Sequence, residues 1–439
     1  MRDVLVTMSV LGLLPFCLFR PWVGVLVWSW LAYMNPHRLT WGFAHDFPFS
    51  QYVALATLLG FVFTNARKSF LFSREILVLG AMWIWFFLTS TAAMYPEDAW
   101  NKFGIVSKIL LMALLVVPLF QDRQKLRILL VVIAVSAGFY GVKGGLFALG
   151  TGGQYMVLGP PDSFFESNTE TALILNMTLP LLLYLGREET RRWARWAFRA
   201  GFVLTMVAVP FTYSRGGVIG LAVVLAVLFV KARRRVLLAP VVIAGLVAFT
   251  MVAPAQWMNR METLEHYQED GSANLRMMSW QVALGIVRDR PVFGGGFRAL
   301  QHRSTYDIYM PEYPREFGHD AHSIYFNLIG EHGWIGLGLF GVLVCMTFLK
   351  LYNLRRLARG NPSIAWAANY AHMLQACIAT YLTTGAFLSV AYFDMAYQVF
   401  ILVPVIHAVA LQELGAEQAR TAASVPVPAT STRSAVRAG

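Results

Sequence analysis

The chain has 439 residues, of which 57% are hydrophobic and only 14% are charged, and its formal net charge at pH 7 is +12. A water-soluble globular protein has about 25% charged residues, so this composition excludes that class and predicts a protein of the lipid bilayer. The positive charge does not indicate nucleic-acid binding, because the basic residues occur in short bursts between apolar runs, where orientation in a membrane explains them.

Apolar runs of roughly the length that crosses a hydrocarbon core recur along nearly the whole chain. They cover residues 4–19, 22–34, 51–64, 76–92, 103–120, 128–149, 169–185, 196–213, 217–230, 236–253, 333–349, 367–390 and 395–411. Arg20 and Pro21 interrupt the first two runs, which are short. Counted as one crossing, they give about 12 transmembrane helices with both termini inside; counted as two, they put the N-terminus outside. We favour the first count, and the predicted fold is an all-α polytopic membrane protein.

The basic bursts predict the orientation of the chain, because cytoplasmic loops carry an excess of Lys and Arg. The bursts lie at residues 67–68, 123–127, 187–199, 231–235 and 350–359. Alternation then puts on the outer face the loops 35–50, 93–102, 150–168 and 254–321, the turn 214–216 and the corner near Asp394. The first run has neither a basic n-region nor a small-residue cleavage site, so no cleavable signal peptide is expected.

The chain is expected to have four parts. They are the ten apolar runs of residues 1–253, an outer loop domain over 254–321, the C-terminal transmembrane helices over 322–412, and a tail over 413–439. The tail is rich in Ala, Ser, Thr and Pro, which predicts a disordered cytoplasmic segment. The three cysteines have no paired spacing, so neither a disulfide frame nor a zinc site is indicated.

The outer loop is too long for a simple connector, and loops of this size are usually functional. Apolar residues at Met278, Val282 and Ile286 follow a helical spacing that stops at Pro291, which predicts an amphipathic helix. The glycines at 294–296 follow no strand and precede no Lys-Ser or Lys-Thr pair, so they predict a turn rather than a phosphate-binding loop.

All seven basic residues of the outer loop are Arg and none is Lys. This bias suits bidentate binding of phosphate or carboxylate, although surface ion pairs with the nine acids of the loop are an alternative. Arg215, in "YSRGG", stands between two apolar runs, where a charge needs a partner unless it snorkels to the interface. Lys143 and Lys108, nearer the outer ends of their runs, can add to a cationic funnel.

The stretch "HDAHSIYFNLIGEHGWIG" (319–336) brings histidines to the mouth of an apolar run. We expect His319 and His322 on a helical turn at the interface, facing the site that the loop encloses. A neutral imidazole there can accept a proton at near-neutral pH. Zinc ligation by these two residues with His332 is an alternative, although the spacing matches no known zinc site. A purely structural set of interfacial histidines is another.

The residues in this stretch resemble a motif of the O-antigen ligase and polymerase superfamily, His-[Asn/Ser/Gln]-nine residues-Gly-two residues-[Gly/Thr/Tyr]. His322, Ser323, Gly333 and Gly336 fill it in register. The Arg-three residues-Leu element of the family is matched at Arg215, with Ile in place of Leu. "SANLRMMSW" and "RDRPVFGGGF" resemble the helix and turn of the large periplasmic loop in that family. Other pieces resemble the exosortase-associated O-glycosylation ligase-like branch, although "ESN" at 166–168 departs from its expected Asp-Asn-Asn.

The resemblance implies a GT-C-like enzyme of the bacterial inner membrane with its active site facing the periplasm. It would transfer a glycan from undecaprenyl diphosphate to lipid A-core. Carried over by position, His322 is the base, Arg215 and Arg276 hold the diphosphate, Arg288 is a reserve candidate, and His319 is a possible support. The outer loop contains no Asp-x-Asp pair, and guanidinium groups stabilise a leaving phosphate well, so a metal-independent, inverting transfer without cofactor is expected.

Three other functions are open. A polymerase that uses a second lipid-linked glycan and a protein O-oligosaccharide ligase would share the same site and differ in the acceptor. A lipid-linked glycan transporter would need two similar halves and ionisable groups on both sides of the midplane. The sequence offers only a polar stripe of Asn369, His372 and Gln375, which is typical of contacts between helices.

Overall fold

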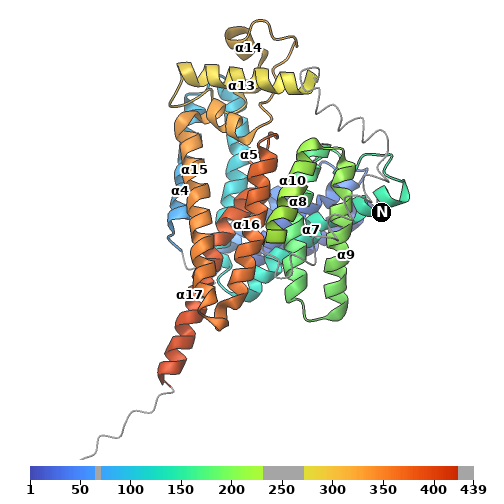
Figure 1. Cartoon of the computed structure of the whole chain (residues 1–439), viewed down its shortest axis with the longest axis vertical. Coiled ribbons are helices and arrows are strands. Elements are labelled where there is room, and N and C mark those ends of the chain that lie inside the picture. The colour runs from blue at the N-terminus through green and yellow to red at the C-terminus, as the bar shows by residue number, and fades with distance from the viewer. Residues whose placement is uncertain (65–70, 231–270, 424–439) are drawn as a thin grey trace, which may run out of the picture.

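The computed structural model describes residues 1–64, 71–230 and 271–423, and within them every regular element is helical. The α-helices are α1 (Arg2–Phe19), α2 (Pro21–Met34), α3 (Phe49–Phe63), α4 (Arg74–Thr91), α5 (Pro96–Leu114), α6 (Val116–Leu119), α7 (Arg123–Gly150), α8 (Asn168–Glu188), α9 (Arg192–Ala208), α10 (Arg215–Val230), α13 (Gly271–Asp289), α14 (Arg303–Tyr309), α15 (Ile324–Arg359), α16 (Ala365–Gly385) and α17 (Asp394–Ala423). Figure 1 shows most of them upright in one bundle.

In the described part of the chain, six helical segments are long and apolar enough to cross a bilayer: α1, α5 with α6, α7, α8, α15 and α17. Each predicted apolar run within the described residues is helical. The chain is therefore a polytopic α-helical membrane protein. The predicted run 236–253, the bursts at 67–68 and 231–235, and the first part of the outer loop, 254–270, lie outside the described residues.

The predicted start of the disordered tail differs from the structure. Helix α17 continues to Ala423, although the tail was expected to begin at residue 413. The first residues of that segment include Glu, Leu, Ala and Gln, which have high helix propensity and extend the helix. Residues 424–439 of the predicted tail lie outside the described residues.

The prediction that the first two apolar runs form one crossing is wrong, because α1 and α2 form an antiparallel hairpin. At the start of α1, the Asp3 carboxylate accepts hydrogen bonds from the main-chain N–H groups of Gly42 and Ala44, which follow α2. The two helices meet at Arg20, whose φ of −134° and ψ of 79° are not helical, and a proline disfavours the helical conformation in the residue before it. The chain therefore reverses at Arg20, and its N-terminus lies on the side of the loop 35–48.

Several loops gather on one side of the bundle. His45 lies 3.7 Å from Asp162, which joins the loop 35–48 to the segment 151–167. The ring centroids of Phe164 and Phe393 are 5.4 Å apart, which joins the latter segment to residues 386–393. We call this side, together with α13 and α14, the loop face; α13 and α14 are at the top of Figure 1.

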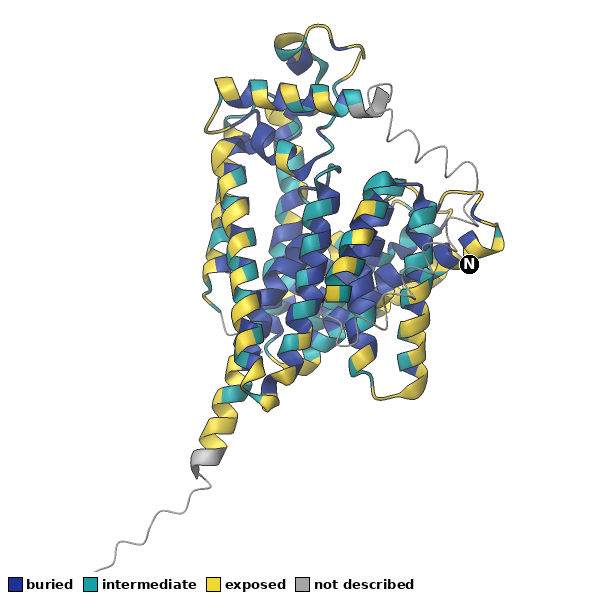
Figure 2. Cartoon of the chain, viewed as in Figure 1, coloured by how far each residue is buried: buried dark blue, intermediate teal, exposed yellow. Residues whose placement is uncertain are grey.

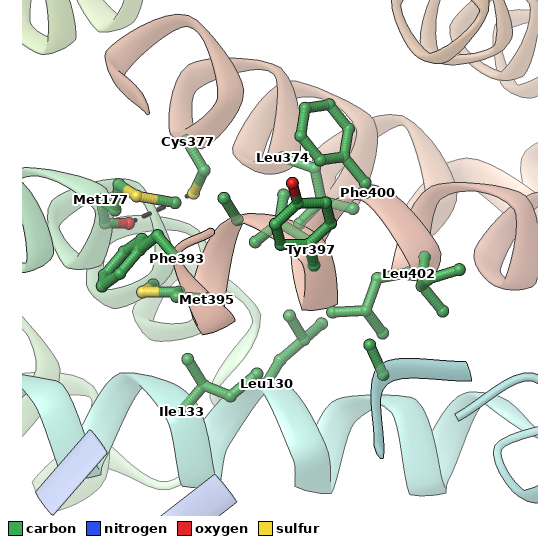
Figure 3. Close-up of a cluster of buried hydrophobic side chains, with 14 of the residues drawn as sticks. Leu130, Ile133, Met177, Leu374, Cys377, Phe393, Met395, Tyr397, Phe400 and Leu402 are labelled. Atoms are coloured by element: carbon green, nitrogen blue, oxygen red, sulfur yellow. Dashed lines mark hydrogen bonds between the residues drawn. The ribbon is translucent and has the colours of Figure 1, made fainter. Parts of the chain in front are cut away.

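The core of the bundle holds α7, α8, α16 and α17 together below the loop face. Its side chains are almost fully shielded, as the dark band in Figure 2 shows. Figure 3 shows Leu130 and Ile133 of α7 facing Met395 and Leu402 of α17. The Cys377 thiol donates to a main-chain carbonyl of α8, 3.2 Å away. This packing fixes the ends of the helices that carry the loops.

Helix α13 lies across the ends of the upright helices (Figure 1). Its residues Val282 and Ile286 are fully buried in a small apolar cluster that also contains Leu300 and Tyr306 from the following loop, and Met278 packs against it. The helix ends at Asp289, just before Pro291. The predicted amphipathic helix and its end are thus confirmed, because the apolar face of α13 covers this cluster.

The first testable prediction concerns orientation. The described basic bursts, at residues 123–127, 187–199 and 350–359, lie at the helix ends opposite the loop face, so the positive-inside rule predicts that the loop face is outside. In a Cys345→Ala background, Glu312→Cys and Arg2→Cys should react with an impermeant maleimide in intact spheroplasts, whereas Gly360→Cys should not. Labelling of Gly360→Cys alone would invert the topology, and protection of Arg2→Cys alone would restore the single crossing.

Candidate functional site

Helix α15 is broken at Gly333, close to the loop face. Gly333 has φ 66° and ψ −169°, a conformation that is essentially restricted to glycine. The break also brings the preceding turn against the following one, because a methyl group on Gly336 would lie 2.3 Å from the His332 Cβ. Both glycines of the sequence motif therefore have a structural reason at this break.

The turn at residues 291–296 fits into the break and binds the main-chain groups that lose their helical partners. The N–H groups of Gly295 and Gly296 donate to the carbonyls of Gly330 (2.8 Å) and Glu331 (2.9 Å), and the Trp334 N–H donates to the Pro291 carbonyl (2.9 Å). The Trp85 indole of α4 donates to the His332 carbonyl (2.9 Å). The glycines of 294–296 thus form a turn, as predicted, and the turn fixes the end of α13 to α15.

His319 and His322 do not lie on a helical turn, in contrast to the prediction. Helix α15 begins only at Ile324, and His322 has φ 45°, in the left-handed region. The segment is held from above: the Tyr306 phenol donates to the His319 carbonyl, and the Trp280 indole donates to the carbonyl of Ala321 over 2.8 Å. These anchors maintain a backbone conformation that a non-glycine residue rarely adopts, and such residues cluster at functional sites.

His322 has charged neighbours. Burial lowers its pKa to about 4; the Asp320 carboxylate acts in the opposite direction, and His319 and the Arg276 guanidinium lower the pKa further. The pKa of His319 is also lowered, mainly by burial. The two imidazole centroids are 4.7 Å apart. The structure therefore brings together three of the predicted residues, His319, His322 and Arg276, and keeps the His322 imidazole neutral at pH 7.

Asp320 is a member of this group that sequence analysis did not assign. Its carboxylate accepts hydrogen bonds from the Ala321 N–H over 2.8 Å, from the Gln301 amide over 3.1 Å and from the Asn327 amide. These donors hold Asp320 beside His322, and its negative charge stabilises an imidazolium once the ring takes up a proton. Its place two residues before His322 was the available signal.

A second buried network adjoins the first. The Glu331 carboxylate accepts from the Arg298 N–H over 2.7 Å and from the Tyr392 phenol over 2.5 Å. The Tyr392 oxygen is 2.7 Å from His332 Nε2, and His332 Nδ1 is 2.7 Å from the Thr89 hydroxyl. Burial raises the pKa of the Tyr392 phenol well above its usual value, so it remains a donor. This network ties α4 and α15 to the segment before α17.

The engagement of His332 argues against the zinc alternative. Both of its ring nitrogens are occupied by hydroxyl partners, and its side chain is fully buried. Within the described residues, no three His, Cys, Asp or Glu side chains are grouped so that they could hold a metal ion. His319 and His322 thus form a pair without His332.

Lys102, which was not predicted as a site residue, lies beside the second network. Its ammonium group lies 5.8 Å from the Tyr392 ring centroid, and it interacts electrostatically with Glu331 and Asp394. Lys108 and Lys143, the two lysines proposed for a cationic funnel, are exposed and form no ion pair with a described residue. The structure thus does not bring either lysine to the site.

The other two predicted arginines have different positions. Arg215 begins α10 on the loop face and is half-buried. A methyl group on its neighbour Gly216 would contact Phe387, so this turn packs beside the segment that carries Tyr392. Arg288 is exposed in the last turn of α13, about 18 Å along the axis from Arg276 at helical rise, and on another face. Arg288 therefore does not join Arg276.

Two family models match the chain. One is described as O-antigen ligase and matches residues 200–341, the part that carries Arg215, α13 and the break in α15. The other, described as a family of unknown function (DUF5935), matches residues 1–190, which include Lys102. No curated protein matches the chain significantly.

Proposed function

We propose, from the premise that this chain belongs to the superfamily of O-antigen ligases and polymerases, that it is an O-antigen ligase of the bacterial inner membrane. It would take a glycan from undecaprenyl diphosphate and join it to lipid A-core on the periplasmic side. The observation that carries the proposal is the group of His322, Asp320 and Arg276 beneath α13 on the loop face, within the residues that the ligase family model matches.

The proposed chemistry is a single displacement. The His322 imidazole accepts the proton of an acceptor hydroxyl as its oxygen attacks the anomeric carbon, and the bond from that carbon to the diphosphate oxygen breaks. Inversion follows from attack opposite the leaving group. Arg276 lies beside His322, where its guanidinium can bind the leaving diphosphate, and Asp320 stabilises the imidazolium that forms. Arg215, which begins α10 beside the Tyr392 segment, is the second proposed contact to the diphosphate.

The related functions differ in the acceptor. A polymerase or a protein O-oligosaccharide ligase would use the same base and the same diphosphate contacts. A transporter would move the donor without forming a new glycosidic bond. The test is therefore to give purified protein a labelled lipid-linked glycan with lipid A-core, a second lipid-linked glycan or an acceptor protein in separate reactions. Label on lipid A-core alone supports the proposal, whereas label on another acceptor, or on none, contradicts it.

Removal of divalent metal should not stop the transfer. Arginine guanidinium groups, rather than a divalent ion, are proposed to neutralise the leaving diphosphate, and the outer-loop sequence contains no Asp-x-Asp pair to hold such an ion. The rate in excess EDTA should equal the rate in buffer with added magnesium. Loss of transfer on chelation, with recovery on addition of one divalent ion, would contradict the metal-independent mechanism.

A further inference from the structure

A cleft of about 540 Å³ opens on the loop face between the segment 151–167 and the start of α8. Three apolar side chains of its wall are exposed: Met156 by 42%, Leu158 by 52% and Phe164 by 41%. Polar groups complete the wall, among them Ser163, Asn168 and Glu170. Exposed apolar side chains next to a few converging polar groups indicate a binding site rather than a packing defect.

The cleft adjoins both networks of the candidate site. Phe164 lies against Phe393, with 5.4 Å between ring centroids, and Phe393 directly follows Tyr392, which binds Glu331. On the other side, the Glu170 carboxylate is close enough to Asp320 to interact with it electrostatically. Two independent contacts therefore place the cleft next to the base His322.

The acidic groups at the cleft disfavour binding of the diphosphate end of the donor. Glu170 forms no ion pair with a described residue, and the hydrogen bond to its carboxylate comes from its own main-chain N–H, so the carboxylate can accept further hydrogen bonds from a ligand. Two acidic groups beside each other repel a diphosphate. Carboxylates do accept strong hydrogen bonds from hydroxyl groups, and the Asn168 amide, held by the Thr212 carbonyl over 3.0 Å, has an oxygen left to accept another. An uncharged, hydroxyl-rich molecule suits these groups.

We propose that this cleft binds a sugar ring of the acceptor glycan. Hydroxyl groups of the ring bind the Glu170 carboxylate and the Asn168 amide, and the apolar face of the ring lies against Phe164. The inference rests on the proposed function, because the acceptor is the substrate whose hydroxyl must reach His322. Bound in this way, the acceptor approaches the base from the α8 side, and the diphosphate is held by the guanidinium groups of Arg276 and Arg215.

Glu170 has a simpler possible role in the first turn of α8, where an acidic side chain stabilises the helix dipole. That role predicts a small loss of stability in Glu170→Gln and no change in the use of either substrate. The two roles are therefore distinguished by substrate dependence. Stability alone does not distinguish them.

The test measures half-saturating concentrations for the donor and for lipid A-core separately. Glu170→Gln keeps the shape of the side chain, and we expect it to raise the value for lipid A-core about tenfold or more, since a hydrogen bond to a charged group is lost. Phe164→Ala should act in the same direction. The value for the lipid-linked donor should not change. The matched controls are Glu97→Gln and Phe43→Ala, which alter an exposed acid and an exposed ring elsewhere on the loop face.

A direct binding measurement separates this inference from the proposed function. Saturation-transfer NMR with delipidated core oligosaccharide should detect binding to the wild type and weaker binding to Glu170→Gln, whether or not transfer is measured. An effect of Glu170→Gln on the donor value alone, or on neither value, would overturn the assignment of the cleft to the acceptor. If the wild type transfers to no acceptor, it is the proposed function that fails.

Discussion

The His322→Ala protein is expected to bind the lipid-linked donor as the wild type does and to transfer the glycan at least about a hundredfold more slowly, the usual scale for a positioned proton acceptor. The donor is held by guanidinium groups that the substitution leaves in place, whereas the acceptor hydroxyl loses its base. Arg276→Ala should instead weaken donor binding together with transfer. Arg276→Lys should restore little of the lost donor binding and transfer, because an ammonium group cannot form the two parallel hydrogen bonds of a guanidinium group.

The pH dependence of the transfer rate is a second test of His322 as the base. Burial lowers the pKa of His322 from 6.5 to about 4, so the transfer rate should not fall as the pH passes through 6.5 but only nearer to pH 4. Because the unfolded chain binds this proton more readily, the contribution of His322 to stability is full above pH 6.5 and is lost as the pH falls toward 4.

Asp320→Asn removes the carboxylate that favours the imidazolium and should slow transfer at pH 7.

The matched control is His37→Ala, which removes another half-buried histidine of the loop face whose ring lies edge-on to Phe49. It should transfer at the wild-type rate. Donor binding is measured by equilibrium filtration of labelled lipid-linked glycan, and transfer by label on the acceptor. A His322→Ala protein that transfers normally, while Arg276→Ala does not, would leave His322 as a structural residue of the interface.

How much of this architecture the sequence could predict depends on the range of the interactions. Helical runs are determined by local hydrophobicity, so the helices appear where they were expected. The reversal between α1 and α2 is not local in this sense. Arg20 and Pro21 mark a break in the helix, but a break permits either a kinked crossing or a hairpin. The hydrogen bonds of Asp3 to the loop after α2 distinguish the two, and no sequence pattern indicates that pairing.

The site follows the same rule. His322 and Arg276 were predicted because they belong to sequence elements with a fixed register. The network around Glu331 was not predicted, because Tyr392 comes from a segment 61 residues away. The lysines of α5 illustrate the remaining difficulty. Lys102 and Lys108 are six residues apart, which turns them through roughly 240° net, so they face different neighbours on one helix. Only the packing of α5 reveals which of them faces the site.

The break in α15 leads to the second large effect. A side chain at Gly333 would place its Cβ 2.2 Å from the Val292 carbonyl oxygen, in addition to the strain of a positive φ, which costs about 1–3 kcal/mol. Gly333→Ala must therefore displace the turn 291–296 from the break. That turn continues from α13, which carries Arg276 and holds Ala321 through Trp280. We expect the transfer rate and the donor affinity to fall together, each by at least about tenfold, which corresponds to about 1.4 kcal/mol.

Gly338→Ala provides the control in the same helix, because a methyl group there meets nothing within 4 Å. It should keep wild-type stability, donor binding and transfer, so that a general effect of alanine on α15 is separated from an effect on the break. The joint loss in Gly333→Ala also differs from His322→Ala, in which donor binding persists. If Gly333→Ala binds donor and transfers like Gly338→Ala, the turn does not position α13 over the base, and Arg276 and His322 are held by other contacts.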